Sequence, residues 1–439
     1  MIGKLRQFND IRKNPKLAPR ELEAFQLRKL RALFAHAYES VPYYRSLFRS
    51  AGISPKDIRS LADLRHIPTS NKDDLRRAGL EAVLAQGSDP DSLTAIRTSG
   101  TTGTPFTFYL APDELKARGL IEFRDLVEIG FRPWDRLVVL GPNPPIKKSP
   151  HQRLGLFRTE RIAPILPIEE QIRRLKALKP TILWAYPAAL RALLESIDGP
   201  LSTLCQPRAL VTSAEMFQPS PKDGGDDLGL DLKHFNFYGC MESGRIAWEC
   251  PAHQGLHVCA DNVILEVEPL ATGPIDGNPA IGEAVITTLN TRTMPFIRYR
   301  LGDLCQYLDK PCSCGRSFPL IAPPIGRTYD LIRMPSGRVL SPYGVLYFLR
   351  EFKKLRRYRI TQVDFGRFLI ELVVQEGATS EDFTALEARL RTFFAEPIAL
   401  ELRPVPAIET HGTKFKVFVS KLPRNGETAA KPEEGSASA

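Results

Sequence analysis

A short segment near residue 100 collects the groups that proteins use to hold phosphate. It reads Thr98, Ser99, Gly100, Thr101, Thr102, Gly103, Thr104 and Pro105. Its glycines let main-chain amides approach an anion closely, and its hydroxyl groups can donate further hydrogen bonds. The lysine and the glycine spacing of a Walker loop are absent. The segment therefore predicts a polyphosphate-binding turn, against the alternative of a polar surface loop.

Three cysteines and one histidine have the composition of a structural zinc site. Six residues separate Cys250 from His257, and a single residue separates Cys312 from Cys314. Three thiolates and an imidazole suit tetrahedral Zn²⁺, and such a full ligand set leaves no open position for catalysis. His253 is a competing ligand because it also follows Cys250 closely. The alternative is a group of buried free thiols, since the seven cysteines are an odd number and argue against a disulfide framework.

Length and composition describe an ordinary globular protein. The chain has 439 residues, which is enough for more than one core, with 43% hydrophobic and 25% charged residues. No apolar run is long enough to span a membrane, and charges interrupt the N-terminal segment, so we expect a cytoplasmic protein without a membrane partner. The net charge is +10, but the basic residues are scattered. Because scattered cations can serve small anions such as ATP and coenzyme A, we expect no nucleic-acid partner.

The order of apolar runs predicts an α/β protein. Strand-like runs at 136–140, 181–185 and 208–212 alternate with helical segments, a rhythm typical of largely parallel sheets. Between about 255 and 308 strand-like runs dominate, which predicts a more antiparallel β subdomain. From about 331 a short α+β pattern indicates a separate small domain. We expect a large N-terminal domain over 1–328 with its zinc-binding β subdomain near 245–320, a C-terminal domain over 329–424 and a disordered tail over 425–439.

Five segments together resemble the motifs of the adenylate-forming superfamily, which includes acyl-CoA synthetases, luciferases and peptide-synthetase adenylation domains. The segment at 98–105 resembles its phosphate-binding motif. Later segments resemble further motifs in the same order: Phe237–Glu242, Tyr299–Asp303, Gly326–Asp330 and Gly412–Lys416. The N-terminal segments 41–45 and 67–76 look like the phenylacetate–CoA ligase branch and its capsule-biosynthesis relatives. The similarity covers roughly residues 25 to 420, and the order of the motifs makes it specific.

The resemblance implies ATP-dependent activation of a carboxylic acid, aryl or arylacetic, to an acyl-adenylate that is then transferred to coenzyme A as a thioester. Mg²⁺ would bridge the phosphates, and Glu242 is its candidate ligand. Tyr238 would stack on the adenine beside Gly239, and Asp303 would accept hydrogen bonds from both ribose hydroxyls. The resemblance also implies ATP-binding roles for Ser213, Glu215, Met241 and Arg327.

The resemblance makes Lys414 the candidate catalytic lysine. In the family this lysine arrives on a mobile C-terminal domain, which closes over the site for adenylation and rotates for thioester formation. An ammonium on a flexible stem suits a developing negative charge. Lys416 is an alternative, because two residues this close in a strand would share one face. The resemblance also favours His257 over His253 as the fourth ligand of the zinc site.

The sequence departs from the family pattern at several motif positions. Met241 stands where most of the family has Thr or Ser, Leu301 stands in place of Thr, and Tyr329 replaces the usual Asp or Lys. Residues 334–342 look more like the capsule-biosynthesis relatives than like CoA ligases. The departures leave other hypotheses open: transfer of the acyl group to an amine, hydroxyl or carrier protein, and a non-catalytic nucleotide-binding relative. The sequence also leaves open whether the protein is a homodimer.

Overall fold

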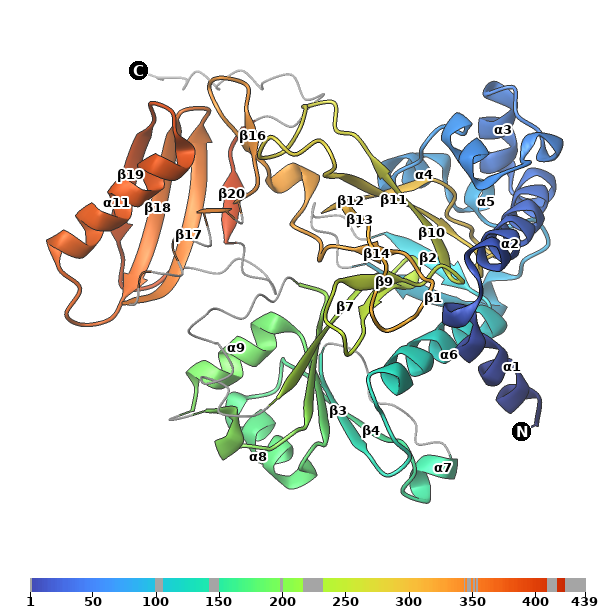
Figure 1. Ribbon diagram of the computed structural model, residues 1–439, viewed down its shortest axis with the longest axis horizontal. Helices are drawn as coiled ribbons and strands as arrows, with labels where there is room; N and C mark the ends of the chain where they lie inside the picture. Colours follow the sequence, from blue (N-terminus) through green and yellow to red (C-terminus); the bar gives the residue numbers. More distant parts are fainter. Residues whose placement is uncertain are drawn as a thin grey trace, which may run out of the picture. The chain divides into compact units, whose positions relative to one another are not determined.

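The computed structural model of the protein describes residues 2–98, 106–141, 150–197, 200–215, 232–342, 344–345, 349, 352, 354–408 and 417–422 (Figure 1). The chain divides into two compact units, the first formed by Met1–Glu268 with Gly282–Pro324 and the second by Pro269–Ile281 with Ile325–Ala439. The expected tail over 425–439 and most of the phosphate-binding segment lie outside the described residues. In the part of the chain that is described, no helix combines the length and the apolar character needed to cross a membrane.

The boundary between the units differs from the predicted one. The second unit begins at Ile325 rather than after 328, and it includes residues 269–281, which the sequence analysis assigned to the first domain. The reason is a contact between distant segments: Asp276 donates its amide to the carbonyl of Val339 at 3.0 Å, and the Asp276 carboxylate accepts from the amide of Ser341 at 3.2 Å. A pattern of apolar residues cannot reveal such a contact.

The N-terminal part of the chain is helical. It contains α1 (Ile2–Lys13), α2 (Pro19–Ser40), α3 (Pro42–Ser50), α4 (Lys72–Ala78) and α5 (Leu80–Val83). α2 and α3 share one core cluster, whereas α4 and α5 contribute to another. Along α2, the buried side chains of Leu30, Phe34 and Ala37 recur at steps of three and four residues, so they share one face of the helix. Phe34 stacks on Phe48 of α3 with ring centroids 4.0 Å apart.

A nine-stranded mixed sheet is the centre of the first unit, with the order β13-β14-β9-β8-β7-β6-β5-β3-β4. Its parallel half contains β3 (Arg136–Leu140), β4 (Arg158–Ile162), β5 (Ile182–Ala185), β6 (Ala209–Ser213) and β7 (Lys233–Cys240). Its antiparallel half contains β8 (Gly244–Glu249), β9 (Leu256–Val258), β13 (Tyr307–Leu308) and β14 (Leu320–Ile321). The prediction of an α/β fold with a mixed sheet is confirmed, and the strands expected at 136–140, 181–185 and 208–212 are parallel.

The parallel strands are covered by helices on both faces (Figure 1). Side chains alternate along a strand, so Val139 packs with α6 (Pro112–Glu128) while Val138 packs with α8 (Ile168–Leu178) and α9 (Pro187–Glu195). The short helix α7 (Pro150–Arg153) precedes β4. Burial on both faces explains why these strands read as continuous apolar runs.

Two smaller antiparallel sheets complete the first unit. β10 (Val263–Glu268), β11 (Gly282–Thr288) and β12 (Tyr299–Cys305) form a three-stranded sheet, and β1 (Thr94–Arg97) pairs with β2 (Thr107–Leu110). The hairpin β1–β2 brackets the predicted phosphate-binding segment. Residues 245–320 do not form one sheet of their own: part of this stretch extends the large sheet and part forms the three-stranded sheet. Antiparallel pairing, as predicted for this region, is found in both parts.

The second unit contains a four-stranded sheet that packs against the helix α11, among other described residues. Its strands β17 (Leu355–Asp364), β18 (Arg367–Val374), β19 (Ala399–Pro404) and β20 (Phe418–Ser420) have the order β19-β18-β17-β20. α11 (Ser380–Phe394) begins at Thr379, whose hydroxyl caps the helix, and Phe394 packs on Phe368 with centroids 4.6 Å apart. The short strands β15 (Ile332–Arg333) and β16 (Val339–Leu340) form a separate pair. The predicted α+β pattern is confirmed.

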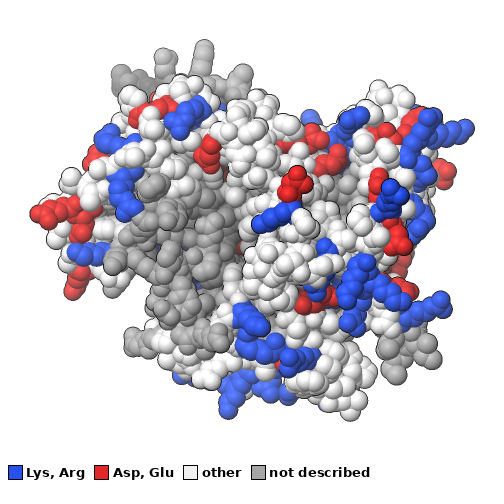
Figure 2. Space-filling model, in the orientation of Figure 1, with Lys and Arg blue, Asp and Glu red and all other residues white. Residues whose placement is uncertain are grey.

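Charged side chains are distributed over the surface rather than collected in one stripe. On the face shown in Figure 2, Lys and Arg lie in several separate groups, with Asp and Glu among most of them. Several exposed helix pairs, such as Glu170 with Arg173 and Arg174, bring opposite charges together.

One buried imidazole in the sheet should couple folding to pH. His234 of β7 contacts the hydroxyl of Thr212 at 2.7 Å, and burial, helped by the charge of His253, lowers the pKa of His234 to about 4. The unfolded chain, with a histidine pKa of about 6.5, binds a proton more readily between these values. Stability should therefore fall, by up to about 3 kcal/mol, as pH drops from about 6.5 to about 4.

Urea unfolding of His234→Gln at several pH values between neutral and pH 4 tests this expectation. The glutamine cannot titrate, so the free energy of unfolding should depend less steeply on pH in this interval than in the unchanged protein. His66→Gln, which replaces an exposed imidazole, is the control and should keep the original slope. An unaltered slope in His234→Gln would contradict the assignment.

Candidate functional site

The end of β7 carries a tyrosine and a glycine that the sequence singled out. Tyr238 is buried, and its hydroxyl donates a hydrogen bond to Asp303 Oδ2 at 2.9 Å. Asp303 belongs to β12, so this bond joins the large sheet to the three-stranded sheet. Burial, followed by the charge of Asp303, raises the pKa of Tyr238 well above its ordinary value. The phenol therefore stays protonated and acts as a donor.

A second hydrogen bond from a tyrosine to a carboxylate lies in the turn that follows β7. Glu242, in the turn between β7 and β8, is 9% exposed, and its Oε1 accepts a hydrogen bond from the hydroxyl of Tyr299 at 3.3 Å. Tyr299 is the first residue of β12. Burial and the charge of Glu242 raise the pKa of Tyr299. The structure thus brings Tyr238, Glu242 and Asp303 together: Asp303 belongs to β12, and Glu242 contacts the first residue of that strand.

An arginine that the sequence analysis missed holds the turn in place. Arg118 of α6 donates to the main-chain carbonyls of Met241, at 2.8 Å, and of Glu242. The guanidinium also lies 5.8 Å from the ring centroid of Phe108, in the strand that follows the phosphate-binding segment. No motif marks Arg118, because its importance comes from where α6 lies in the fold. Met241 itself is 46% exposed, so its side chain points away from these contacts.

The neighbouring parallel strands end beside Tyr238. Ser213, the last residue of β6, pairs in register with Phe237, and its hydroxyl accepts a hydrogen bond from Trp184 Nε1 at 2.7 Å. Glu215 follows and accepts the amide of Ala188, at the start of α9, at 3.0 Å. The carboxyl edge of parallel strands is where α/β proteins bind ligands. The predicted residues Ser213 and Glu215 therefore lie on the same edge as Tyr238.

Three groups of predicted residues are placed less completely. Thr98 is described, and its hydroxyl accepts the amide of Phe106 at 3.2 Å across the hairpin, but residues 99–105 lie outside the described part. Lys414 and its alternative Lys416 also lie outside it. Arg327 belongs to the second unit, with its guanidinium 5.7 Å from the ring centroid of Tyr329.

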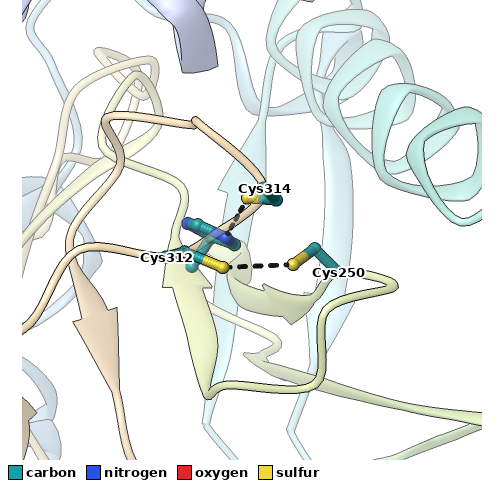
Figure 3. Close-up of side chains that lie close together, drawn as sticks. Cys250, Cys312 and Cys314 are labelled. Atoms are coloured by element: carbon teal, nitrogen blue, oxygen red, sulfur yellow. Dashed lines mark hydrogen bonds between the residues drawn. The ribbon is translucent and has the colours of Figure 1, made fainter.

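The predicted metal ligands come together at the antiparallel end of the large sheet (Figure 3). The donor atoms of Cys250, His257, Cys312 and Cys314 all lie within 4.8 Å of one another. The two sulfur atoms of Cys250 and Cys312 are 3.6 Å apart, and Cys314 Sγ lies 3.2 Å from His257 Nε2. Three thiols and an imidazole at these separations match the donor set of tetrahedral zinc.

The alternative ligand, His253, points elsewhere. Its Nδ1 lies 3.1 Å from Glu249 Oε1, and its ring stacks on Phe235 with centroids 5.2 Å apart. His257, in contrast, is buried and turns Nδ1 to the carbonyl of Phe318 at 3.0 Å. A proton on Nδ1 leaves the lone pair of Nε2 directed at the thiols, as in a metal-binding histidine. The geometry therefore favours His257.

Two thiols of this cluster have pKa values shifted in opposite directions. Burial raises the pKa of Cys250 to about 12. Burial also opposes ionisation of Cys314, but hydrogen bonds from Arg316 and from the neighbouring thiols outweigh it, so the pKa of Cys314 is lowered. A bound cation would favour the thiolate at all of these positions.

Comparison with curated proteins gives a consistent result. No protein-family model matches the chain. A phenylacetate–coenzyme A ligase of Thermus thermophilus is 30% identical over 339 residues, which cover 72% of each chain. The chain belongs to the phenylacetate–CoA ligase family. A phenylacetate–coenzyme A ligase of Escherichia coli K12, 29% identical over 337 residues and covering 71% of this chain and 72% of its own, agrees with this assignment.

Solved structures show the same fold. The structure of 2-hydroxyisobutyryl-CoA ligase in the postadenylation state superposes with a TM-score of 0.77 at 19% identity, covering 93% of this chain and 91% of that one. A benzoate CoA ligase from Burkholderia xenovorans superposes with a TM-score of 0.52 at 15% identity, covering 77% and 70% of the two chains. The phenylacetate–CoA ligase relationship and these structures thus agree on the architecture that positions Tyr238, Glu242 and Asp303.

Gly239 is required by the packing of this hairpin, which leads to a stability prediction. A Cβ atom at Gly239 would lie 2.4 Å from the carbonyl oxygen of Gly244, so Gly239→Ala must push β7 and β8 apart at Tyr238. We expect a loss of about 1–3 kcal/mol in the free energy of unfolding together with a loss of activity.

Thermal unfolding checks this prediction against a matched control. Gly119→Ala makes the same change in the interior of α6, where no atom lies within 4 Å of the added Cβ, and it should leave stability equal or raise it by up to about 1 kcal/mol. Equal melting temperatures for the two variants would contradict the close approach at Gly239.

Proposed function

We propose that this member of the phenylacetate–CoA ligase family activates an aryl or arylacetic acid with ATP and transfers the acyl group to coenzyme A. The family makes it an ATP-dependent acid–thiol ligase. The observation that carries the proposal is the pair of hydrogen bonds from Tyr238 to Asp303 and from Tyr299 to Glu242. These bonds bring separate motifs into one site, at the carboxyl edge of a parallel sheet, with acceptors for a sugar and for a cation.

Each group would then have a separate task in binding ATP. Asp303 would accept hydrogen bonds from the ribose hydroxyls, and Tyr238 would pack against the adenine with Gly239, Ser213 and Glu215 along the same edge. Glu242 would hold Mg²⁺, which neutralises phosphate charge when bound. The phosphate-binding segment 98–105 would hold the β- and γ-phosphates through amides and hydroxyls. We also assign contacts with ATP to Met241 and Arg327.

The proposed reaction has two steps. A carboxylate oxygen of the acid attacks the α-phosphorus of ATP, the bond to the β-phosphate oxygen breaks, and pyrophosphate leaves. The thiolate of coenzyme A then attacks the acyl carbon, and AMP leaves as the carbon–oxygen bond breaks. Both steps bring anions together, so positive groups and fixed donors must offset the repulsion. We propose Lys414, carried by the second unit, as the cation that stabilises the first transition state, and a cytoplasmic location where ATP and coenzyme A are available.

Exchange of labelled pyrophosphate into ATP, tested with a panel of carboxylic acids, measures the first step. We expect exchange with aryl or arylacetic acids, and release of AMP that depends on coenzyme A. Lys414→Ala should slow exchange strongly without altering the melting temperature, whereas Lys416→Ala is the matched control and should retain most of the rate. Exchange without coenzyme A-dependent AMP release would point to an amine, hydroxyl or carrier protein as acceptor. No exchange with any acid would overturn the proposed enzyme.

We further propose that Cys250, His257, Cys312 and Cys314 hold a structural Zn²⁺. The donor set, the separations and the Nδ1 bond of His257 support this assignment. The strands around the cluster are short: β9 has 3 residues and β13 and β14 have 2 each. Such strands make few ladder hydrogen bonds, so a metal cross-link would supply the missing stability.

Elemental analysis of the purified protein should find about one zinc per chain. Cys312→Ser should release the metal and lower the melting temperature. Cys205→Ser is the control, because Cys205 is a buried free thiol in a different core cluster, and this variant should keep its zinc. Metal-free protein prepared without chelators, or full zinc content in Cys312→Ser, would refute the site.

A further inference from the structure

The α6-facing side of the parallel sheet carries a row of large side chains near its carboxyl edge. In the sheet register, Val139 of β3 is the partner of both Arg161 of β4 and Trp184 of β5. Partners in register face the same side, and Val139 and Trp184 pack in the cluster that includes α6. Arg161 therefore projects from the edge strand toward the α6 side, in the same row as Trp184.

The next residues along two of these strands form the edge itself. Tyr186 follows β5 and donates its amide to the carbonyl of Leu140 at 3.1 Å. A Cβ atom at Gly141 would lie 3.3 Å from the ring of Tyr186, so the ring covers Gly141 on the α6 side. The absence of a side chain at Gly141 leaves the ring of Tyr186 close to the sheet. A flat aromatic surface thus lies between Arg161 on one side and Ser213 on the other.

Arg161 has buried donors that nothing in the described chain satisfies. Its Nε and Nη1 atoms are both inaccessible to solvent and make no hydrogen bond with the residues that the structure describes. Burial raises the pKa of Tyr186, and the charge of Arg161 is the leading group that opposes this rise. The guanidinium of Arg161 therefore lies near the hydroxyl of Tyr186. Buried donors without acceptors cost free energy, which a ligand that brings an acceptor recovers.

The neighbouring cation on the same side, Arg245, provides a contrast in charge rather than in hydrogen bonding, because its Nε also makes no hydrogen bond with the described residues. Arg245 lies 3.4 Å from the carboxylate of Asp125 and sits over the rings of Phe237, at 4.0 Å, and Trp184, at 5.1 Å. Its charge is therefore neutralised within the protein. Within the described residues, no carboxylate lies at ion-pair distance from Arg161. The difference marks Arg161 as the cation that is left for a ligand.

We propose that Arg161 selects the acid substrate by binding a hydrogen-bond acceptor on its aromatic ring, so that the substrates are aryl or arylacetic acids with a ring carboxylate or hydroxyl. This inference rests on the proposed acid activation. The acid must place its reacting carboxylate near the site at β6 and β7, and neighbouring strands are about 4.8 Å apart. A ring lying over Gly141 and Tyr186 then directs its far substituent toward β4. A guanidinium only donates hydrogen bonds, and it binds a carboxylate through two parallel ones.

Pyrophosphate exchange with matched acids tests the inference in the unchanged protein. The probes are phenylacetate and its meta- and para-substituted carboxy, hydroxy, methyl and amino derivatives. We expect kcat/KM for at least one carboxy or hydroxy acid to exceed that for its methyl counterpart by on the order of 100-fold, because a site built to donate hydrogen bonds rejects a group that cannot accept them. The amino-substituted phenylacetates mainly offer hydrogen-bond donors, so their kcat/KM should be as low as that of the methyl-substituted acids.

Arg161→Met tests the residue itself. The variant should lose the preference for the acceptor-bearing acid and gain rate with the methyl acid. Arg161→Lys, which keeps the charge but not the paired donors, should show an intermediate preference. Arg158→Met is the matched control: Arg158 lies on the same strand, with its side chain on the opposite face, and its substitution should leave the ratio between the two acids unchanged.

The possible failures are distinct. Exchange that favours unsubstituted or methyl-bearing acids, or an unchanged preference in both Arg161 variants, overturns the inference while the proposed function stands. Absence of exchange with every acid overturns the proposed function, and the inference falls with it. If Arg161→Met does not fold, as judged by thermal unfolding, the Arg161→Lys variant and the acid preference of the unchanged protein decide the question.

Discussion

The contact between the hairpin β7–β8 and the strand β12 is the constraint on which the site depends. Tyr238 and Tyr299 come from different sheets. Tyr238 of β7 donates a hydrogen bond to Asp303 of β12, and Tyr299 of β12 donates one to Glu242 in the β7–β8 turn. Burial keeps both phenols protonated, so the two bonds persist at neutral pH. Because a carboxylate held by a fixed donor has little freedom to turn, Asp303 and Glu242 are oriented before any ligand arrives, and little free energy is needed to arrange them.

The cluster of Cys250, His257, Cys312 and Cys314 lies on strands that extend the same sheet from β7. Cys250 directly follows β8, which pairs with the strand that carries Tyr238. His257 lies in β9, and Cys312 and Cys314 lie between β13 and β14. A metal bound there would join the ends of short strands that few main-chain hydrogen bonds hold, and it would stiffen the side of the sheet next to the site. Its role in this view is stability, not chemistry.

The arginines on α6 and on the sheet differ in whether their donors have partners within the protein. Arg118 uses its donors on carbonyls of the Glu242 turn, and Arg124 is paired with Asp261 at 2.6 Å. Both serve the protein, Arg118 through hydrogen bonds to the main chain and Arg124 through ion pairs as well. Arg161 lies on the same side of the sheet with buried donors left over. Positive groups with internal partners build the scaffold, while one without them is available for recognition of an anion or another acceptor.

The sequence by itself determined the alternation of strands and helices, the identity of the motif residues and the likeness to phenylacetate–CoA ligases, because apolar periodicity and short motifs are local properties of a chain. It favoured His257 over His253 only through the resemblance, and it could not place Arg118 beside Glu242 or assign residues 269–281 to the second unit. Each of these depends on which segments meet across long separations in sequence. Only the packing of two sheets and a helix settles such contacts, since the same residue types occur elsewhere in the chain without them.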